Sequence, residues 1–192
     1  MNSRWLLLKQ FLLHPVQVGA IAPSSPALCR ELVHWLDAES ISAVAELGPG
    51  TGAVTTEIMS WISDRTRFFA VELDPAICRE LQKNMPQLKL YNANASDLVE
   101  LCAREGITEL DAVVSALPWA SFPESLQRNL LTAVVDSLKQ GGKFSTFAYL
   151  QGLAMPGGKR LRKLLKEYFT QVELSPVVWN NFPPAVVYRC IK

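Results

Sequence analysis

The sequence lacks a strong charge of either sign. Nineteen Lys and Arg residues stand against eighteen Asp and Glu residues, which leaves a formal net charge of +1 over 192 residues. Proteins that bind nucleic acid through their overall field are usually much more basic, so the composition predicts no nucleic-acid partner. Histidine is nearly absent, with two residues, and the four cysteines contain no C-x-x-C pair. We therefore expect reduced, structural cysteines and no metal site.

The sequence also lacks an apolar run long enough to cross a bilayer. The candidate, Trp5–Leu13, has nine residues. They make about 14 Å of helix, whereas the hydrocarbon core is ~30 Å thick. Lys9, Gln10 and His14 also interrupt the continuous apolar region that a secretory signal needs. We expect Arg4–His14 to form an amphipathic helix that lies either on the bilayer or on the domain itself.

Apolar and amphipathic segments alternate along the rest of the chain. Strands are expected at Ala43–Gly48, Arg67–Leu73, Gln87–Asn92, Leu110–Ala116, Lys143–Leu150, Gln171–Trp179 and Pro184–Ile191. Helices are expected near 52–63, 74–86, 97–105, 123–142 and 159–169. Strands that are separated by helices indicate an α/β fold with a parallel sheet covered on both faces. The last two strands, which no helix separates, predict one antiparallel partner at the end of the sheet.

The most informative motif is "ELGPGTG", Glu46–Gly52, between the first strand and the following helix. Its three glycines allow a tight turn in which backbone approaches a ligand closely. Glu72 ends the second strand about twenty residues later, where a carboxylate can bind ribose hydroxyls. A dinucleotide turn usually reads G-x-G-x-x-G, and the Glu46 carboxylate would repel a pyrophosphate. The same carboxylate suits the ammonium group of a methionyl moiety, either directly or through water.

This E-x-G-x-G-x-G pattern resembles motif I of the class I S-adenosylmethionine-dependent methyltransferases. The resemblance implies a Rossmann-like, seven-stranded, mostly parallel sheet with its antiparallel strand second from the edge and helices on both faces. It also implies S-adenosylmethionine as the cofactor and S-adenosylhomocysteine as the product. By position, the implied cofactor-binding residues are Ser25, Glu46, Gly48, Gly50, Thr51, Gly52, Glu72, Asn94, Ala95 and Ser115. Asn94 and Ala95 follow the third strand and would meet the adenine, and an ordinary polar loop is the alternative.

The motif "SALPW", Ser115–Trp119, lies at the tip of the fourth strand. Amine N-methyltransferases often carry a D/N-P-P-Y/F/W-like element there, whose carbonyls hold the amine and whose aromatic ring stacks near the reacting centre. This resemblance implies catalytic roles for Ser115 and Trp119, with a packing role as the alternative for Trp119. The rRNA adenine dimethylases have a related N-L-P-Y/F element, and the serine at the first position weakens that comparison.

Five short elements together resemble the bacterial phospholipid N-methyltransferases of the rhizobial type. They are "GAIAPSS", "ELGPGTG", "VVSALPW", "FAY" and "NNFPPAVVYR", at 19–25, 46–52, 113–119, 147–149 and 180–189. The resemblance implies N-methylation of phosphatidylethanolamine toward phosphatidylcholine. By position it implies a catalytic and substrate-binding role for Tyr149 and substrate contacts for Ser24, Asn181 and Pro183. Tyr149 as a cap of the sheet, and "NFPPA" as a rigid loop, are the plainer alternatives.

The same resemblance divides the chain into an N-terminal amphipathic arm and lid, 1–25, and a methyltransferase domain, 26–192. A lipid substrate requires a membrane-facing surface, ideally one that attracts anionic lipid. The N-terminal helix is one candidate, and the basic helix at 159–169 is the other. In that second helix Leu161, Leu164, Leu165 and Tyr168 share one face and cations cover the others, so the solvated face of a core helix is its alternative.

We therefore expect a cytoplasmic enzyme at the inner face of the plasma membrane, with its oligomeric state open. Two rival functions remain at this stage. One is an rRNA adenine N6-methyltransferase, and the other is a non-catalytic module that binds the cofactor or a membrane.

Overall fold

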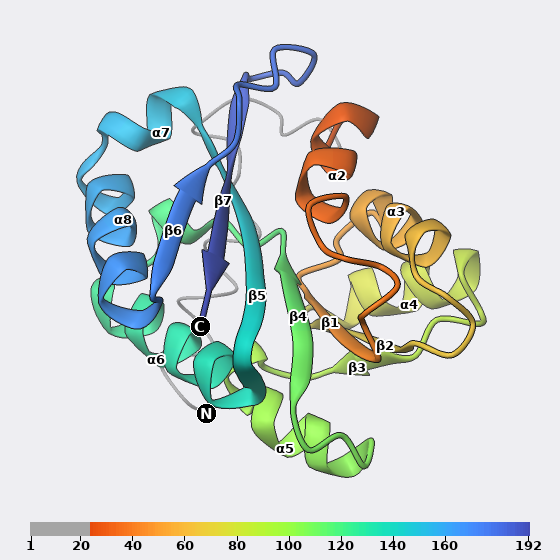
Figure 1. Cartoon of the computed structure of the whole chain (residues 1–192). Coiled ribbons are helices and arrows are strands. Elements are labelled where there is room, and N and C mark those ends of the chain that lie inside the picture. Colours follow the sequence, from red (N-terminus) through yellow and green to blue (C-terminus); the bar gives the residue numbers. More distant parts are fainter. Residues whose placement is uncertain (1–23) are drawn as a thin grey trace.

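The chain folds around a seven-stranded sheet with the order β3-β2-β1-β4-β5-β7-β6 (Figure 1). The structure is a computed structural model, and it describes residues 24–192. The strands are β1 Ala43–Leu47, β2 Arg67–Glu72, β3 Leu90–Asn92, β4 Leu110–Ser115, β5 Leu138–Tyr149, β6 Gln171–Leu174 and β7 Ala185–Ile191. The pairs from β3 to β5 are parallel, and β7 runs antiparallel to both β5 and β6. The expected sheet, with its antiparallel strand second from the edge, is confirmed.

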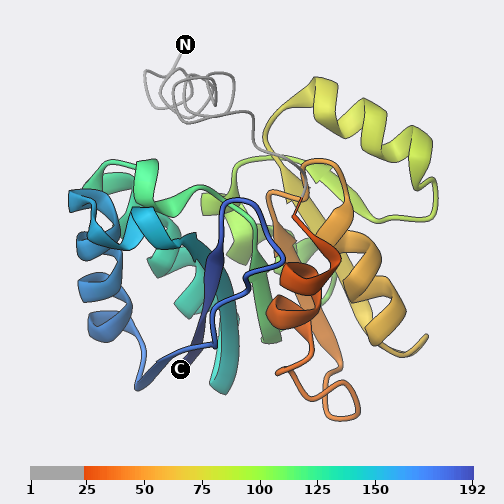
Figure 2. The same ribbon diagram turned by 90° about the horizontal axis from the view of Figure 1, so that it is seen from above.

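Helices cover both faces of the sheet (Figures 1 and 2). One face carries α2 Pro26–Val33, α3 Ala53–Trp61 and α4 Pro75–Asn84. The other carries α5 Leu98–Arg104, α6 Glu124–Ser137 and α8 Pro156–Tyr168. The described residues also form three short elements: the 3₁₀ turns η2 Ala95–Asp97 and η3 Trp119–Ser121, and the helix α7 Leu150–Ala154.

Strand β1 lies at the centre of this three-layer arrangement. All five of its residues are buried. Ala45 and Leu47 belong to the apolar core beneath α5, α6 and α8, whereas Val44 belongs to the core beneath α2 and α3. Successive side chains of a strand point to opposite faces, so a strand that is covered on both sides must be apolar at nearly every position. The one exception in β1 is Glu46.

Helix α6 ends earlier than the sequence predicts. The expected end is Gly141–Gly142, but the helix stops at Ser137 and the chain enters β5 directly at Leu138. The end of the helix is stabilised by Lys192, 54 residues beyond Leu138. Its ammonium group donates to the carbonyl of Leu138 at 2.6 Å and to that of Val135 at 2.7 Å. A cation is favourable at the carbonyl end of a helix. Sequence patterns near Gly141 do not reveal this distant partner.

Strand β6 is also shorter than expected. It ends at Leu174 rather than Trp179, and beyond it only Val178 makes an isolated antiparallel bridge, to Ala185. The segment 175–184 is therefore a loop between β6 and β7 rather than a continuation of the strand.

Helix α8 is amphipathic, as predicted. Leu161, Leu164 and Leu165 are buried against the sheet, while Arg162 and Lys166 are exposed. Packing of the apolar face on the sheet is therefore confirmed. The contact of its cationic side with anionic lipid stays a prediction.

The helix predicted at Arg4–His14 and most of the lid predicted at 19–25 lie outside the described residues. Within residues 24–192, no helix is long and apolar enough to span a membrane. All four cysteines are buried and free of disulfides, in agreement with structural thiols.

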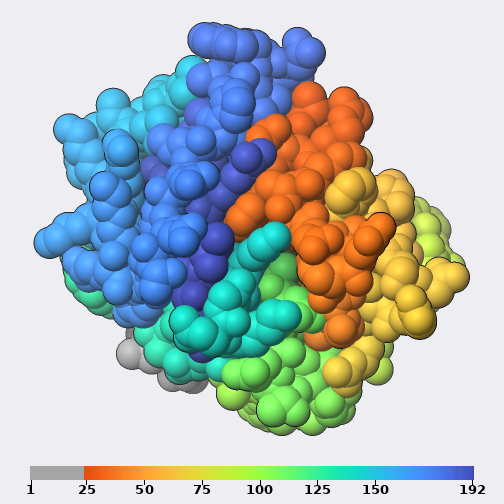
Figure 3. All heavy atoms as spheres, viewed as in Figure 1, coloured from red at the N-terminus to blue at the C-terminus, as the bar shows by residue number. Residues whose placement is uncertain are grey.

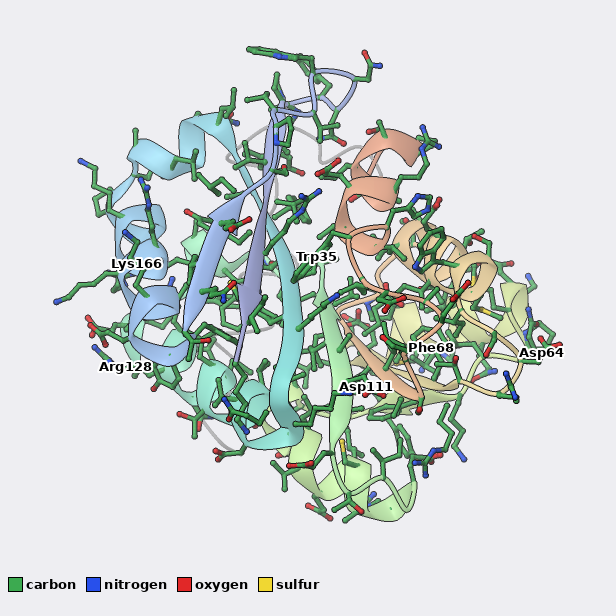
Figure 4. All side chains as sticks on the ribbon, viewed as in Figure 1. Trp35, Asp64, Phe68, Asp111, Arg128 and Lys166 are labelled. Carbon is green, nitrogen blue, oxygen red and sulfur yellow. The ribbon has the colours of Figure 1, made fainter. Side chains whose placement is uncertain are left out.

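Asp111 holds the start of β1 against β4 (Figure 4). Its Oδ2 accepts hydrogen bonds from the backbone N–H groups of Ser42 at 2.7 Å and Ala43 at 2.9 Å, and its Oδ1 pairs with Lys139. Burial raises the pKa of Asp111, but the Lys139 ion pair and the two N–H donors outweigh burial. The pKa therefore lies below the usual range of aspartate.

Replacement of Asp111 by alanine should destabilise the fold by about 1 kcal/mol, because the N–H groups of Ser42 and Ala43 lose a charged acceptor and the one on Ala43 is partly buried. Since the folded-state pKa is lowered, the stabilisation should be complete above about pH 4 and lost as the pH falls through the folded-state value. Urea unfolding of the wild type, Asp111→Ala and the exposed control Asp64→Ala at pH 7 and pH 3 measures both effects. An equal loss for the two variants at pH 7 would contradict the role of Asp111.

Candidate functional site

The glycine turn joins β1 to α3 at the carboxyl edge of the sheet. Gly48 adopts a φ of +73°, and its N–H donates to the carbonyl of Val71 at 2.9 Å, which ties the turn to β2. A Cβ at this position would lie 2.6 Å from a methyl carbon of Leu117. A side chain there would be strained by the positive φ and would also displace the Leu117 side chain. Gly50 and Gly52 also have positive φ values, and Thr51, between them, is exposed.

Glu72 lies beside this turn at the end of β2. Its side chain is buried, with Oε1 accepting from the N–H of Asp74 at 3.0 Å and Oε2 facing the N–H of Gly50 at 3.4 Å. Burial raises the pKa of Glu72, more than the backbone hydrogen bonds lower it. The carboxyl group is thus held in a fixed orientation at the position where the sequence predicts a ribose contact.

A small cleft opens between Glu72 and the glycine turn. It is lined by Gly48, Val71, Glu72, Leu73, Ala93, Ala95, Leu117 and Leu130. These walls are apolar except for the one carboxyl group, which matches a purine nucleoside with a flat apolar base and a ribose that offers two hydroxyls. The chemistry of these lining residues therefore suits the nucleoside half of S-adenosylmethionine.

Glu46 is the only charged residue in β1 and is fully buried. Its Oε2 accepts a hydrogen bond from the Thr55 hydroxyl at 2.7 Å, while its Oε1 has no partner. Burial raises the pKa of Glu46 to about 8, against the lowering effect of the Thr55 hydrogen bond and with a smaller raising effect from Glu72. A buried carboxyl oxygen without a donor is costly, and an ammonium group supplies such a donor. The site therefore also fits the methionyl half of the cofactor.

The loop after β3 places Ala95 and Asn94 differently. Ala95 lines the cleft, as expected for a residue near the base. The side chain of Asn94 caps the 3₁₀ turn η2 instead, with its Oδ1 accepting from the N–H of Ser96 at 3.0 Å. The side-chain amide oxygen of Asn94 therefore binds within its own loop. Contact of Asn94 with the adenine stays a prediction.

The tip of β4 bears on the sequence interpretation of Ser115 and Trp119. The Trp119 side chain is 1% exposed and packs edge-on against Phe144, with ring centroids 5.7 Å apart. Its indole N–H donates to Ser115 Oγ at 2.9 Å, and Ser115 is itself fully buried. The burial of the Trp119 ring in the core favours its packing role, which the sequence left open, and its catalytic role stays a prediction. Ser115 orients that ring, so its predicted catalytic side-chain role is not supported, and Leu117 is the residue of this motif that lines the cleft.

Two motifs from opposite ends of the chain meet at Ser25 and Asn181. The N–H of Ser25 donates to Asn181 Oδ1 at 2.9 Å, and Asn181 Nδ2 donates to the carbonyl of Pro183 at 2.7 Å. Ser25 Oγ caps α2 by accepting from the N–H of Leu28 at 3.2 Å. The structure thus brings Ser25, the last residue of the predicted lid, to the predicted acceptor loop, where its N–H and the Asn181 side chain bind each other. The ligand contacts of Ser24, Ser25, Asn181 and Pro183 stay predictions.

Tyr149 ends β5 next to this junction. It lies opposite Ala185 in the β5–β7 pairing, and the next residue, Leu150, donates its N–H to the carbonyl of Pro184 at 3.0 Å. Its ring is partly buried and meets Phe147 edge-on, with centroids 5.4 Å apart. Burial raises the pKa of Tyr149, so the phenol is neutral and able to donate a hydrogen bond at physiological pH. Its catalytic role stays a prediction.

Sequence reasoning missed Thr55 and the apolar walls of the cleft. Thr55 follows Glu46 by nine residues, a separation that becomes a contact only when α3 folds back across β1. The sequence could have pointed to Leu117. It stands in "SALPW" where the related D/N-P-P-Y/F/W element has the first of its two prolines, and its side chain lies beside Gly48.

Three known proteins are similar to this chain. An ornithine lipid N-methyltransferase from Singulisphaera acidiphila is 31% identical over 195 residues, which cover 99% of this chain and 96% of that protein. The structure of a precorrin-6y C5,15-methyltransferase from Geobacter metallireducens has a TM-score of 0.68 at 17% identity, covering 92% of this chain and 96% of that one. An O-methyltransferase from Bacillus cereus, solved in complex with SAH, has a TM-score of 0.69 at 12% identity, covering 100% and 92%. At these identities the two structures show a shared fold, and no protein-family model matches the chain.

Substitution of Glu72 by glutamine should weaken S-adenosylmethionine binding about tenfold or more, since a charged acceptor for the ribose hydroxyls is lost. Isothermal titration calorimetry measures the dissociation constant, and circular dichroism verifies folding. Glu80→Gln, on the exposed side of α4, is the matched control. An unchanged dissociation constant in a folded Glu72→Gln protein would remove Glu72 from the site.

The raised pKa of Glu46 should make the ligand-free protein less stable as the pH rises from about 5 to about 8. The folded state keeps a proton there that the unfolded state has released, so the free energy of unfolding falls by at most about 1.4 kcal/mol per pH unit and levels off above pH 8. Glu46→Gln should remove most of this slope, as measured by urea unfolding at pH 5.5, 7 and 8.5. An identical slope in the variant would show that Glu46 is already ionised in the folded protein.

Proposed function

The chain belongs to the lipid N-methyltransferase family that the Singulisphaera acidiphila enzyme represents, within the class I S-adenosylmethionine-dependent methyltransferases, and we propose that it methylates the primary amine of a membrane lipid. The relationship spans both chains almost completely, so it includes the acceptor side of the fold as well as the cofactor side. This full-length relationship is the observation that carries the proposal.

S-adenosylmethionine, when bound, supplies an electrophilic methyl group on a good leaving group. The residues of the chain then have to bind, align and exclude water. Glu72 and the glycine turn would hold the nucleoside end, and Glu46 would hold the ammonium end. Tyr149 and the loop before β7 lie at the same edge of the sheet, on the far side of β4, where they would hold the acceptor.

The acceptor amine must be neutral when it attacks, because an ammonium nitrogen has no lone pair. An apolar, partly closed pocket favours the neutral form of an amine, since desolvation disfavours its charge. Tyr149 offers its ring face to a cationic product and its hydroxyl to an anionic head-group oxygen. In this proposal the acceptor ammonium group loses its proton to water before the neutral nitrogen attacks the methyl group.

Ornithine lipid is the first candidate acceptor, since the relative that covers the whole chain is named for it. Phosphatidylethanolamine is the second, since "GAIAPSS" and "NFPPA" resemble the phospholipid N-methyltransferases. Both lipids present a primary amine near an anionic group, which is a carboxylate in the first and a phosphodiester in the second.

The rival functions have less support. For an adenine methyltransferase, Ser115 departs from the asparagine that begins the element of the rRNA dimethylases, and a net charge of +1 supplies no field that would attract RNA. A module that only binds a membrane would have no need of the buried carboxyl groups of Glu46 and Glu72. The full-length relationship to a lipid N-methyltransferase favours an enzyme over a module that only binds the cofactor. We place the proposed reaction at the cytoplasmic face of the membrane, where the cofactor is available.

The acceptor can be identified by offering methyl-labelled S-adenosylmethionine to the purified protein with separate acceptors. These are phosphatidylcholine vesicles doped with ornithine lipid, the same vesicles doped with phosphatidylethanolamine, free ornithine with free ethanolamine, and RNA. We expect label in ornithine lipid, and incorporation that drops with Glu72→Gln but not with Glu80→Gln. Label in phosphatidylethanolamine alone selects the second candidate, and label in RNA alone overturns the lipid proposal.

A further inference from the structure

The loop between β6 and β7 exposes two large aromatic side chains. Trp179 is 71% exposed and Phe182 is 85% exposed, the two highest values among the large hydrophobic residues of the described chain, 24–192. The loop, Ser175–Pro184, contains no charged residue. Figure 3 shows it projecting beyond the neighbouring surface at the blue end of the colour scale. Isolated surface apolar residues are ordinary, but two aromatics on one uncharged projection are not.

This exposure does not come from a loosely attached segment. Val178 donates its N–H to the carbonyl of Ala185 at 2.8 Å, and Ser175 Oγ accepts from the N–H of Val187 at 2.9 Å. Asn181, between the two aromatics, is 4% exposed and binds the backbone of Ser25 and Pro183. The backbone is thus anchored inward while the flanking rings are held outward.

The loop lies at the same edge of the sheet as the cofactor cleft. The register aligns Leu47 with Ser115 and Ser115 with Thr146, so β1, β4 and β5 end side by side. β7 pairs directly with β5, which places the start of β7 three strand spacings, or about 14 Å, from β1. Figure 2 looks onto this edge and shows the loop between α2 and α7. The loop and the cofactor cleft therefore open onto the same edge of the sheet.

A second uncharged segment borders the loop. Leu150–Gly158, which forms α7 and the start of α8, has no charged residue, and its Met155 is 52% exposed. The N–H of Leu150 donates to the carbonyl of Pro184, which fixes this segment to the end of the loop. The first charge beyond it is the exposed Lys159. We call Met155, Trp179 and Phe182 the edge patch.

We propose that the edge patch docks the protein on the surface of a lipid bilayer. The inference rests on the proposed function, since a lipid acceptor must be reached while its acyl chains stay in the membrane. Trp and Phe side chains partition into the interfacial region, and a surface without charges enters it with little desolvation cost. Lys159 then lies at the level of the head groups, where a cation is attracted to anionic lipid.

The edge patch also refines the role expected of the basic helix. Helix α8 starts at this edge and runs away from it along the side of the domain (Figure 1). Docking at the edge patch therefore brings the start of α8, rather than its whole cationic side, near the membrane.

Sedimentation with vesicles tests the proposal. The vesicles contain phosphatidylcholine and phosphatidylglycerol, neither of which has a primary amine, so the result does not depend on the acceptor. We expect the double variant Trp179→Ala/Phe182→Ala to lose about tenfold or more in vesicle partitioning. Its affinity for S-adenosylmethionine and its unfolding midpoint should match the wild type. Val99→Ala is the control, since Val99 is an apolar side chain that is 48% exposed on α5, outside the edge patch.

Each outcome decides the question. Unchanged partitioning of the double variant, or no vesicle binding by the full-length wild type, overturns docking through the edge patch. A wild-type dimer that the double variant dissociates, seen by analytical ultracentrifugation without any loss of vesicle binding, assigns the patch to a second copy and overturns it as well. Vesicle binding that depends on the aromatics, with no label in any lipid in the acceptor assay, supports docking and rejects the proposed function alone.

Discussion

The burial of β1 between two helical layers is the constraint on which the rest of the structure depends. A strand covered on both faces has to be apolar, yet this one contains Glu46, which no water reaches and which only Thr55 partners. The neighbours of β1 are parallel to it, so the ends of β2 and β4 lie at the same edge. The glycine turn, Glu72 and Leu117 converge there for that reason. The cofactor site is therefore a consequence of where the central strand ends.

The acceptor side is built by different means. It depends on contacts between segments that are far apart along the chain, above all the hydrogen bond from Ser25 to Asn181 across 156 residues. This contact fixes the start of α2 to the loop before β7, and the same loop is joined to the end of β5 through Leu150 and Pro184. The two sides thus have distinct structural roles. In the proposed function, the central strands hold the cofactor end, and an outer loop that is tied down by hydrogen bonds faces the acceptor.

The proposed docking through the edge patch would orient the cofactor side and the acceptor side toward the membrane together. The aromatics of the loop and the cleft beside Gly48 share one edge of the sheet, so an orientation that inserts the rings also turns the cleft toward the lipid head groups. The rigid anchoring of Asn181 keeps the distance between bilayer and cofactor constant. Catalysis by alignment requires such a constant distance, because methyl transfer depends strongly on the geometry of approach.

The sequence alone determined the sheet, its antiparallel strand, the glycine turn and the carboxyl groups of Glu46 and Glu72, because these follow from local periodicity and short spacings. It also determined the amphipathic packing of α8. Tertiary structure alone decided the direction of side chains whose partners lie elsewhere. The Trp119 ring lies in the core, where it donates to Ser115 and packs against Phe144. The Asn94 side chain caps a turn. Helix α6 ends where the Lys192 ammonium group binds its last carbonyls. The physical reason is the range of the interactions, since a motif fixes its own backbone whereas a side chain is oriented by whatever the fold brings beside it.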